Sequence, residues 1–180
     1  NLVGGKERFT QKLDSMFTYN PSADEDLPIF STGMIGQYAH GNEPSHHIIH
    51  MYNYVDQSYK TQELVDSVLH TLYFNDPNGL SGNEDCGQMS AWYILNAMGF
   101  YQVCPGKPVY SIGRPLFDKT TIHLKGGKTF TIVTHNNSRE NKYVQKMVLN
   151  GKELKAPFFA HQDMIDGGTL ELTMGGEPLK

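Results

Sequence analysis

The sequence predicts an α+β fold, in which a helical part over residues 1–104 is followed by a β-rich part over residues 105–180. Apolar residues recur at helical spacing in the first part, whereas they alternate with polar residues in the second. Between the two parts lies Pro105-Gly106-Lys107-Pro108, a combination that interrupts helices and strands alike. We therefore expect packed helices joined to a small antiparallel β-sheet.

Four segments of the first part have the spacing of helices. We expect them at residues 5–17, 46–55 (with Pro44 at the first helical position), 62–74 (with Thr61 as its cap) and 89–98 (ending at Gly99). The acidic segment 24–26 lies between the first two and is expected to be a solvated loop. Its acids are consecutive, whereas those of a calcium-binding EF-hand alternate.

The second part has the alternation and the turn residues of a small sheet. Strands are expected at residues 121–124, 129–134, 143–149 and 169–174, and a short helix at 160–166. Turns are expected at Gly126-Gly127 and at Asn150-Gly151, the second of which is the strongest short hairpin signal.

Composition excludes several classes of function. The chain is 38% hydrophobic and 19% charged with a net charge of -4, and no Lys/Arg-rich run is present, so nucleic-acid binding is not expected. No apolar run approaches the roughly 20 residues that span a bilayer, and no signal peptide is visible. Because the sequence begins at Asn1 instead of Met, we expect a piece of a longer polypeptide. Cys86 and Cys104 either form one disulfide or, as the favoured interpretation, are buried free thiols.

The loop Gly82-Asn83-Glu84-Asp85-Cys86-Gly87 is the first candidate for chemistry. It precedes the helix 89–98, where backbone N–H groups and the helix dipole stabilise carboxylates. A helix cap needs one carboxylate, and capping remains the alternative. Glu84 and Asp85 are adjacent acids, which repel and shift each other's pKa, and such pairs are found at functional sites.

The segment 40–47, His-Gly-Asn-Glu-Pro-Ser-His-His, is the second candidate. Asn42 and Glu43 offer oxygen ligands, and His46 and His47 offer imidazoles. Zinc fits poorly, because the HExxH pattern requires a Glu where His47 stands. Oxygen ligands beside a proline turn suit calcium better. A helix start with hydrogen-bonded histidines remains open.

Aromatic residues close to these clusters could stack on sugar rings, but their helical spacing favours packing in the core. They are Tyr52, Tyr54, Tyr59, Trp92, Tyr93, Phe100 and Tyr101. His123, His135 and His161 are isolated from one another in the sequence and are given no role.

Taken together, these motifs resemble glycoside hydrolase family 92, the calcium-dependent exo-acting α-mannosidases. The resemblance covers nearly the whole chain but only the C-terminal portion of a complete family member. The matching segments are residues 36–47, 52–54, 60–62, 82–93, 97–101, 115–119 and 168–174.

The resemblance implies a longer protein with an N-terminal β-sandwich and an (α/α)6 barrel, and the helical part of this chain would come from the end of that barrel. Family members are inverting enzymes, in which one carboxylic acid protonates the leaving oxygen and a second carboxylate activates water. Carried onto this chain, the resemblance implies that Asp85 is the general base and Glu84 its partner or substitute.

For the rest of the site, the resemblance implies that Asn42 and Glu43 bind Ca2+ and that His46, His47 and Gln88 line the substrate pocket. The metal would hold mannose hydroxyls and favour a distorted ring.

The general acid would lie upstream of this chain, so the isolated chain is predicted to be inactive. The longer protein is predicted to release terminal mannose from mannans or N-glycans, with α-1,2 specificity. Its partners would be mannose-containing glycans and the remainder of the parent polypeptide, and its location periplasmic, cell-surface or secreted in a bacterium. The alternative function is a non-catalytic, calcium-dependent carbohydrate-binding module.

Overall fold

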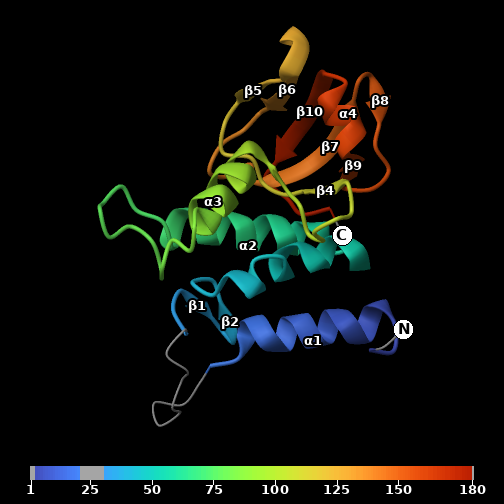
Figure 1. The fold of residues 1–180 in the computed structure, drawn as a ribbon. Coiled ribbons are helices and arrows are strands. Elements are labelled where there is room, and N and C mark those ends of the chain that lie inside the picture. Colours follow the sequence, from blue (N-terminus) through green and yellow to red (C-terminus); the bar gives the residue numbers. More distant parts are fainter. Residues whose placement is uncertain (1–2, 21–30, 180) are drawn as a thin grey trace.

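The computed structural model describes residues 3–20 and 31–179, so the acidic segment 24–26 lies outside the described residues. The helices lie in tiers beneath a β-rich half (Figure 1). The helical half contains α1 (Lys6–Thr18), β1 (Met34–Ile35), β2 (Tyr38–Ala39), η1 (Glu43–Ser45), η2 (Ile48–Val55), α2 (Ser58–Thr71) and α3 (Gln88–Met98), where η denotes a 3-10 helix.

The β-rich half contains two sheets. A five-stranded sheet has the order β5 (Lys119–His123), β6 (Thr129–His135), β10 (Gly168–Gly175), β7 (Tyr143–Leu149) and β8 (Lys152–Glu153). A three-stranded sheet has the order β3 (Phe100–Tyr101), β4 (Val109–Ile112) and β9 (Phe158–Ala160). The turn η3 (Lys125–Gly127) and the helix α4 (His161–Ile165) complete this half. The α+β fold class is thereby confirmed.

The larger sheet is mixed, which differs from the expectation of an entirely antiparallel sheet. Strand β10 is antiparallel to β7 but parallel to β6, with Leu170 opposite Ile132. The reason is the crossover through β9 and α4, which inserts the last strand between β6 and β7 instead of adding it to an edge. The hairpin predicted at Asn150-Gly151 is confirmed, because both residues have positive φ and β7 pairs with β8 across them.

Two of the four predicted helices agree closely with the structure, and the other two differ. Helices α1 and α3 match the expected segments, and Gly99 ends α3 in the left-handed conformation. Helix α2 begins at Ser58, so Thr61 is not its cap. Thr61 is buried inside the helix, and its hydroxyl instead donates a hydrogen bond to the Ile49 carbonyl of η2.

The expected helix 46–55 is replaced by the 3-10 turns η1 and η2. A 3-10 helix aligns residues three apart along one line, and this places His50 and Asn53 together against β4. His50 Nδ1 lies 3.1 Å from Ser111 Oγ, and Asn53 Nδ2 donates to the same oxygen at 2.7 Å. Polar pairing with the β-rich half therefore accounts for the tighter helix.

Each half buries its own apolar core, and both apolar and polar contacts join the two, since Leu95 of α3 packs against both cores. The β-rich core includes Phe130, Leu170 and Leu172, whereas the helical core includes Val65 and Trp92. A further link is an ion pair between the buried Arg114, just after β4, and Asp66 of α2, with Nε and Oδ1 3.0 Å apart. This pair lacks the alignment of a hydrogen bond.

Cys86 and Cys104 are both free and exposed. The expectation of buried thiols was therefore wrong, because each cysteine lies in a surface loop and not on the packed face of a helix. Among the described residues, no helix is both long and apolar enough to cross a membrane.

Candidate active site

The two predicted clusters meet, backbone against backbone, at Gly41 and Gly82. A Cβ on Gly82 would lie 2.8 Å from the Gly41 carbonyl oxygen, and a Cβ on Gly41 would overlap the Ser81 carbonyl oxygen. The Thr32 hydroxyl donates to this same Ser81 oxygen at 2.8 Å. Glycine at both positions therefore lets the segment that carries Asn42 and Glu43 lie directly against the loop that carries Glu84 and Asp85.

Glu84 is engaged at the start of α3. Its carboxylate accepts hydrogen bonds from the Ser90 backbone N–H at 3.1 Å and from the Ser90 hydroxyl at 2.9 Å. Ser90 is the third residue of α3, so Glu84 satisfies one of the unpaired N–H groups at the helix N-terminus. Glu84 therefore caps the N-terminus of α3, as the capping alternative predicts.

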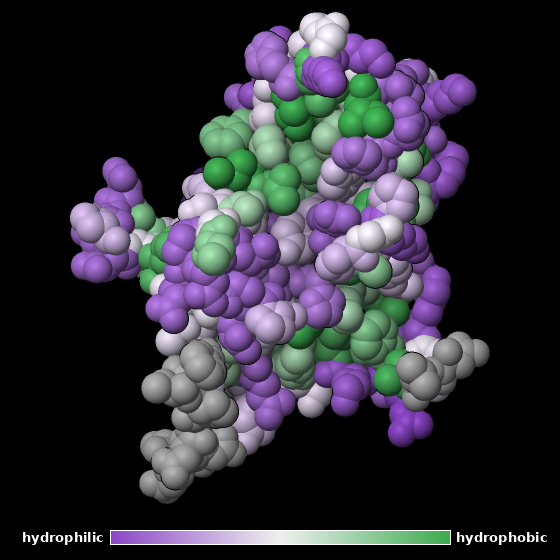
Figure 2. Space-filling model, viewed as in Figure 1, coloured by the Kyte–Doolittle hydropathy of each residue, from purple (hydrophilic) through white to green (hydrophobic). Residues whose placement is uncertain are grey.

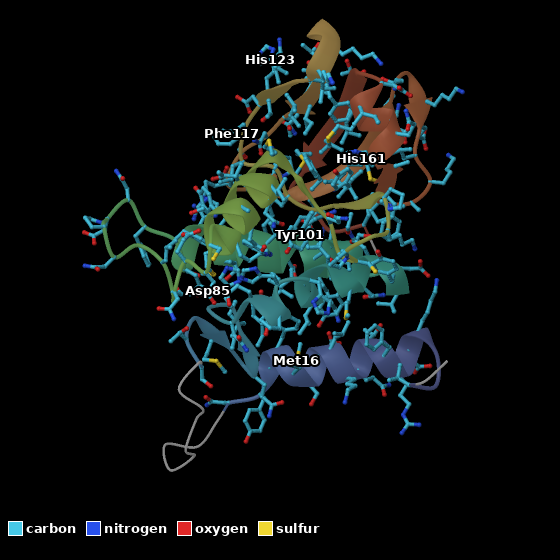
Figure 3. The ribbon with its side chains drawn as sticks, in the orientation of Figure 1. Met16, Asp85, Tyr101, Phe117, His123 and His161 are labelled. Carbon is cyan, nitrogen blue, oxygen red and sulfur yellow. The ribbon has the colours of Figure 1, made fainter. Side chains whose placement is uncertain are left out.

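Asp85 lies free beside Glu84. Its side chain is exposed, and its carboxylate forms no hydrogen bond or ion pair within the described part of the chain. Asp85, Cys86 and Gly87 have φ values of 46, 58 and 93°, so three successive residues adopt the left-handed conformation. That conformation costs roughly 1–2 kcal/mol for each non-glycine residue, and strain of this kind is concentrated at functional sites. Figure 3 shows Asp85 on this loop below α3, whereas His123 and His161 lie far away on the β-rich half.

Glu43 carries a buried oxygen without a partner. Its Oε1 is inaccessible to solvent and has no hydrogen bond to the described residues. A buried carboxylate oxygen is costly unless a donor or a cation satisfies it. Across residues 3–20 and 31–179, no three His, Cys, Asp or Glu side chains lie close enough to share a metal ion. A hard cation at Glu43 would therefore draw on other oxygens, such as the Asn42 amide and backbone carbonyls.

The buried His46 and the half-buried Gln88 form one hydrogen-bonded unit. The His40 carbonyl can only accept, so His46 Nε2 donates to it at 3.0 Å and His46 Nδ1 accepts from Gln88 Nε2 at 3.0 Å. Gln88 Nε2 also donates to the Tyr101 hydroxyl at 3.1 Å, which leaves the amide oxygen of Gln88 as its remaining polar group. Burial lowers the pKa of His46, so the ring is neutral.

His47 lies apart from His46 and Gln88. It lines a groove of about 410 Å³ against α1, together with Phe9, Met16 and Met51. Adjacent residues of a tight turn point in different directions, and the structure therefore does not bring His47 together with the Asp85 loop. A larger cleft of about 510 Å³ lies at the start of α2, where the rings of Tyr54 and Phe158 contact each other.

Core packing is confirmed for Trp92 of α3 and for Phe100 and Tyr101 of β3, which are all buried. Tyr93 of α3 is half-buried. The surface around the Asp85 loop is mostly hydrophilic, whereas apolar side chains gather over part of the β-rich half and over the helices beside α1 (Figure 2).

Two residues of the site, His40 and Tyr73, were given no role on the basis of the sequence. The buried His40 hydrogen-bonds the Tyr38 and Tyr73 hydroxyls at 2.8 and 2.7 Å, and Tyr73 also donates to the Met89 carbonyl at 3.1 Å. Tyr73 sits just past the end of α2 and resembles an ordinary helix-terminal aromatic residue. A polar tip on an otherwise buried aromatic position is the signal that could have identified it.

Comparison with known proteins identifies the family. The model of the glycosyl hydrolase family 92 catalytic domain matches residues 1–176. A protein of Arthroderma benhamiae described as an uncharacterized secreted glycosidase is 31% identical over an alignment of 180 positions, which covers 98% of this chain and 21% of that protein.

Solved structures agree with this assignment. A family GH92 α-mannosidase from Bacteroides thetaiotaomicron in complex with mannoimidazole has a TM-score of 0.90 and 40% identity, covering 97% of this chain and 23% of that chain. A family GH92 inverting mannosidase from the same species has a TM-score of 0.82 and 41% identity, covering 98% of this chain and 25% of that chain. The chain thus spans about a quarter of the length of these relatives, and it belongs to glycosyl hydrolase family 92.

Proposed function

We propose that this chain supplies the general base and the calcium-site residues of an inverting, exo-acting α-mannosidase that removes terminal mannose from α-1,2-linked mannans or N-glycans. The contact between Gly41 and Gly82 carries the proposal, because it joins the two motifs into one site. The similar solved structures are an inverting mannosidase and a mannosidase bound to mannoimidazole, which supports mannose as the sugar.

Asp85 is the general base in this proposal. A base must be able to accept a proton from the attacking water. The Asp85 carboxylate is exposed and has no hydrogen bond or ion pair with the described residues. Glu84 is occupied by Ser90 and anchors the loop to α3. In an inverting reaction, the base activates water on the face of the sugar opposite the leaving oxygen. Asp85 would take that proton while Glu84 keeps the loop in place.

Glu43 and Asn42 are proposed to hold calcium. The unpartnered, buried Oε1 of Glu43 fits a cation ligand, and carboxylate and amide oxygens are the donors that calcium prefers. When bound, the ion would orient sugar hydroxyls and stabilise charge in the transition state. Glu43 contributes the negative charge of the site, and Asn42 begins the turn η1 that presents it.

Gln88 and His46 are proposed to line the substrate pocket. With its nitrogen committed to His46 and Tyr101, the Gln88 amide can only accept a hydrogen bond from a ligand hydroxyl, through its oxygen. His46 fixes that orientation of the amide. The substrate contact of His47, which faces α1, stays a prediction.

The general acid is proposed to lie in the remainder of the parent polypeptide, so the isolated chain should not hydrolyse α-mannosides. Secretion to the periplasm, the cell surface or the medium is also proposed, in keeping with the description of the Arthroderma protein as secreted.

A panel of linkage-defined mannobioses tests the proposal. The longer protein that contains this chain should release mannose from the α-1,2-linked substrate, and a calcium chelator should abolish release until calcium is added back. The 180-residue chain should be inactive on the same panel. Sugar binding without turnover by the longer protein would favour the binding-module alternative, and turnover by the 180-residue chain would show that the acid lies within it.

A further inference from the structure

The Tyr73 hydroxyl lies at the junction of the two motif segments. On one side it hydrogen-bonds His40, which directly precedes Gly41, and on the other it hydrogen-bonds Met89 in the first turn of α3. The residue is held in place from several directions. Its backbone pairs with Leu80 in an isolated β-bridge, and its ring is parallel to that of Trp92 within 2°.

The directions of both hydrogen bonds of Tyr73 are determined. The Met89 carbonyl can only accept, so the Tyr73 O–H donates to it, and the Tyr73 oxygen must accept from His40 Nε2–H. The other ring nitrogen of His40, Nδ1, lies 2.8 Å from the Tyr38 hydroxyl. The Tyr73 hydroxyl therefore uses its proton on α3 and its oxygen on the residue that precedes Gly41.

Burial raises the pKa of Tyr73, so its hydroxyl stays protonated at neutral pH and acts as a fixed donor and acceptor instead of a proton carrier.

We propose that Tyr73 is a positioning residue that couples the segment Gly41–Glu43 to the loop 84–88, so that the two segments keep one mutual geometry. The coupling rests on the hydrogen bonds of Tyr73 alone, whereas its consequence for catalysis rests on the roles proposed above for Glu43 and Asp85. Tyr73 touches neither substrate nor water in this scheme and acts through His40 and Met89.

The variant Tyr73→Phe removes both hydrogen bonds and retains the ring packing. His40 Nε2–H is then buried without an acceptor, and an unsatisfied buried donor favours local rearrangement. The matched control is Tyr93→Phe. Tyr93 lies one helical turn after Met89, and the centroids of the Tyr93 and Tyr73 rings are 4.8 Å apart. The Tyr93 hydroxyl has no hydrogen bond to the described residues.

Amide hydrogen exchange on the longer protein tests the coupling without reference to activity. In Tyr73→Phe, the amides of residues 41–43 and of residues 84–88 should both exchange at least about fivefold faster, whereas Tyr93→Phe should leave both unchanged. Faster exchange in only one segment, in neither, or equally in the Tyr93→Phe control would overturn the proposal.

Calcium titration and kinetics then test the consequence for the site. Tyr73→Phe should weaken calcium binding several-fold and lower kcat roughly tenfold to hundredfold, with a smaller change in KM, because misplacement of the base affects the reacting geometry. Unchanged calcium affinity and kcat together with faster exchange would confine Tyr73 to a structural role and overturn the positioning claim. If the longer protein hydrolyses no α-mannoside, the proposed function fails, while the exchange experiment still decides the coupling.

Discussion

Replacement of Gly41 by alanine tests whether the contact between the two motif segments creates the site. A Cβ at residue 41 would overlap the Ser81 carbonyl oxygen and the Thr32 hydroxyl, and it would lie 2.9 Å from the Ser81 carbonyl carbon. Real Cβ contacts essentially never fall below 3.0 Å. Ser81 presents backbone and not a flexible side chain, so the two segments themselves must move apart.

The size of the effect follows from that displacement. A separation of roughly 1 Å between the segment that carries Asn42 and Glu43 and the loop that carries Asp85 should lower kcat/KM about 10²-fold, which corresponds to about 2.7 kcal/mol of transition-state stabilisation. Overpacking should also lower the free energy of unfolding by about 1–3 kcal/mol. The substitution introduces no left-handed strain, because Gly41 does not have a positive φ.

The assay is kcat/KM of the longer protein on an aryl α-mannoside, measured well below the melting temperature of each variant. Gly176→Ala is the matched control, because Gly176 also lacks a positive φ and its added Cβ would lie 3.5 Å from the nearest atom, an ordinary contact. The control should keep wild-type activity. A Gly41→Ala variant that keeps kcat/KM within about twofold of wild type and is equally stable would refute the reasoning.

Three further predictions concern stability and the roles of the two acids. Burial lowers the pKa of His50 from 6.5 to about 4, so the unfolded chain takes up the proton first as the pH falls. The stability that His50 contributes above pH 6.5 should be lost towards pH 4 at up to about 1.4 kcal/mol per pH unit, and His50→Gln should flatten that slope in urea titrations. Arg114→Ala should cost about 3 kcal/mol by leaving Asp66 without its cation, and an unchanged urea midpoint would contradict this. Glu84→Gln should keep most of the turnover, because its amide oxygen can still accept the Ser90 N–H. A loss as large as that of Asp85→Asn would move the base to Glu84.

Local signals in the sequence predict much of the fold. Gly99 ends α3, and Asn150-Gly151 forms the hairpin between β7 and β8, because positive φ at these positions is a property of a few residues in a short window. The short helix α4 lies within the segment predicted from the sequence, 160–166.

Features that depend on distant partners could not be predicted in this way. The 3-10 form of η2 depends on Ser111, about sixty residues later, and the insertion of β10 between β6 and β7 depends on a crossover without a local signature. The same holds in the site. Because Glu84 and Asp85 are adjacent, the sequence does not show which of them caps α3. The hydrogen bonds that Ser90 donates identify Glu84 as the capping residue.

The prediction of a site from the two motifs is strengthened by their contact at Gly41 and Gly82, which neither motif reveals alone. His47 illustrates the opposite case. It follows His46 directly, yet it lies in the groove against α1, because a tight turn separates the directions of neighbouring side chains.

Turnover by Asp85→Asn in the longer protein tests the central claim most directly. Asparagine has nearly the same shape but cannot accept the proton of the attacking water. Release of mannose should fall by several orders of magnitude, while the affinity for mannose and for calcium should be largely kept. Turnover close to wild type in this variant would contradict the assignment of Asp85 as the general base.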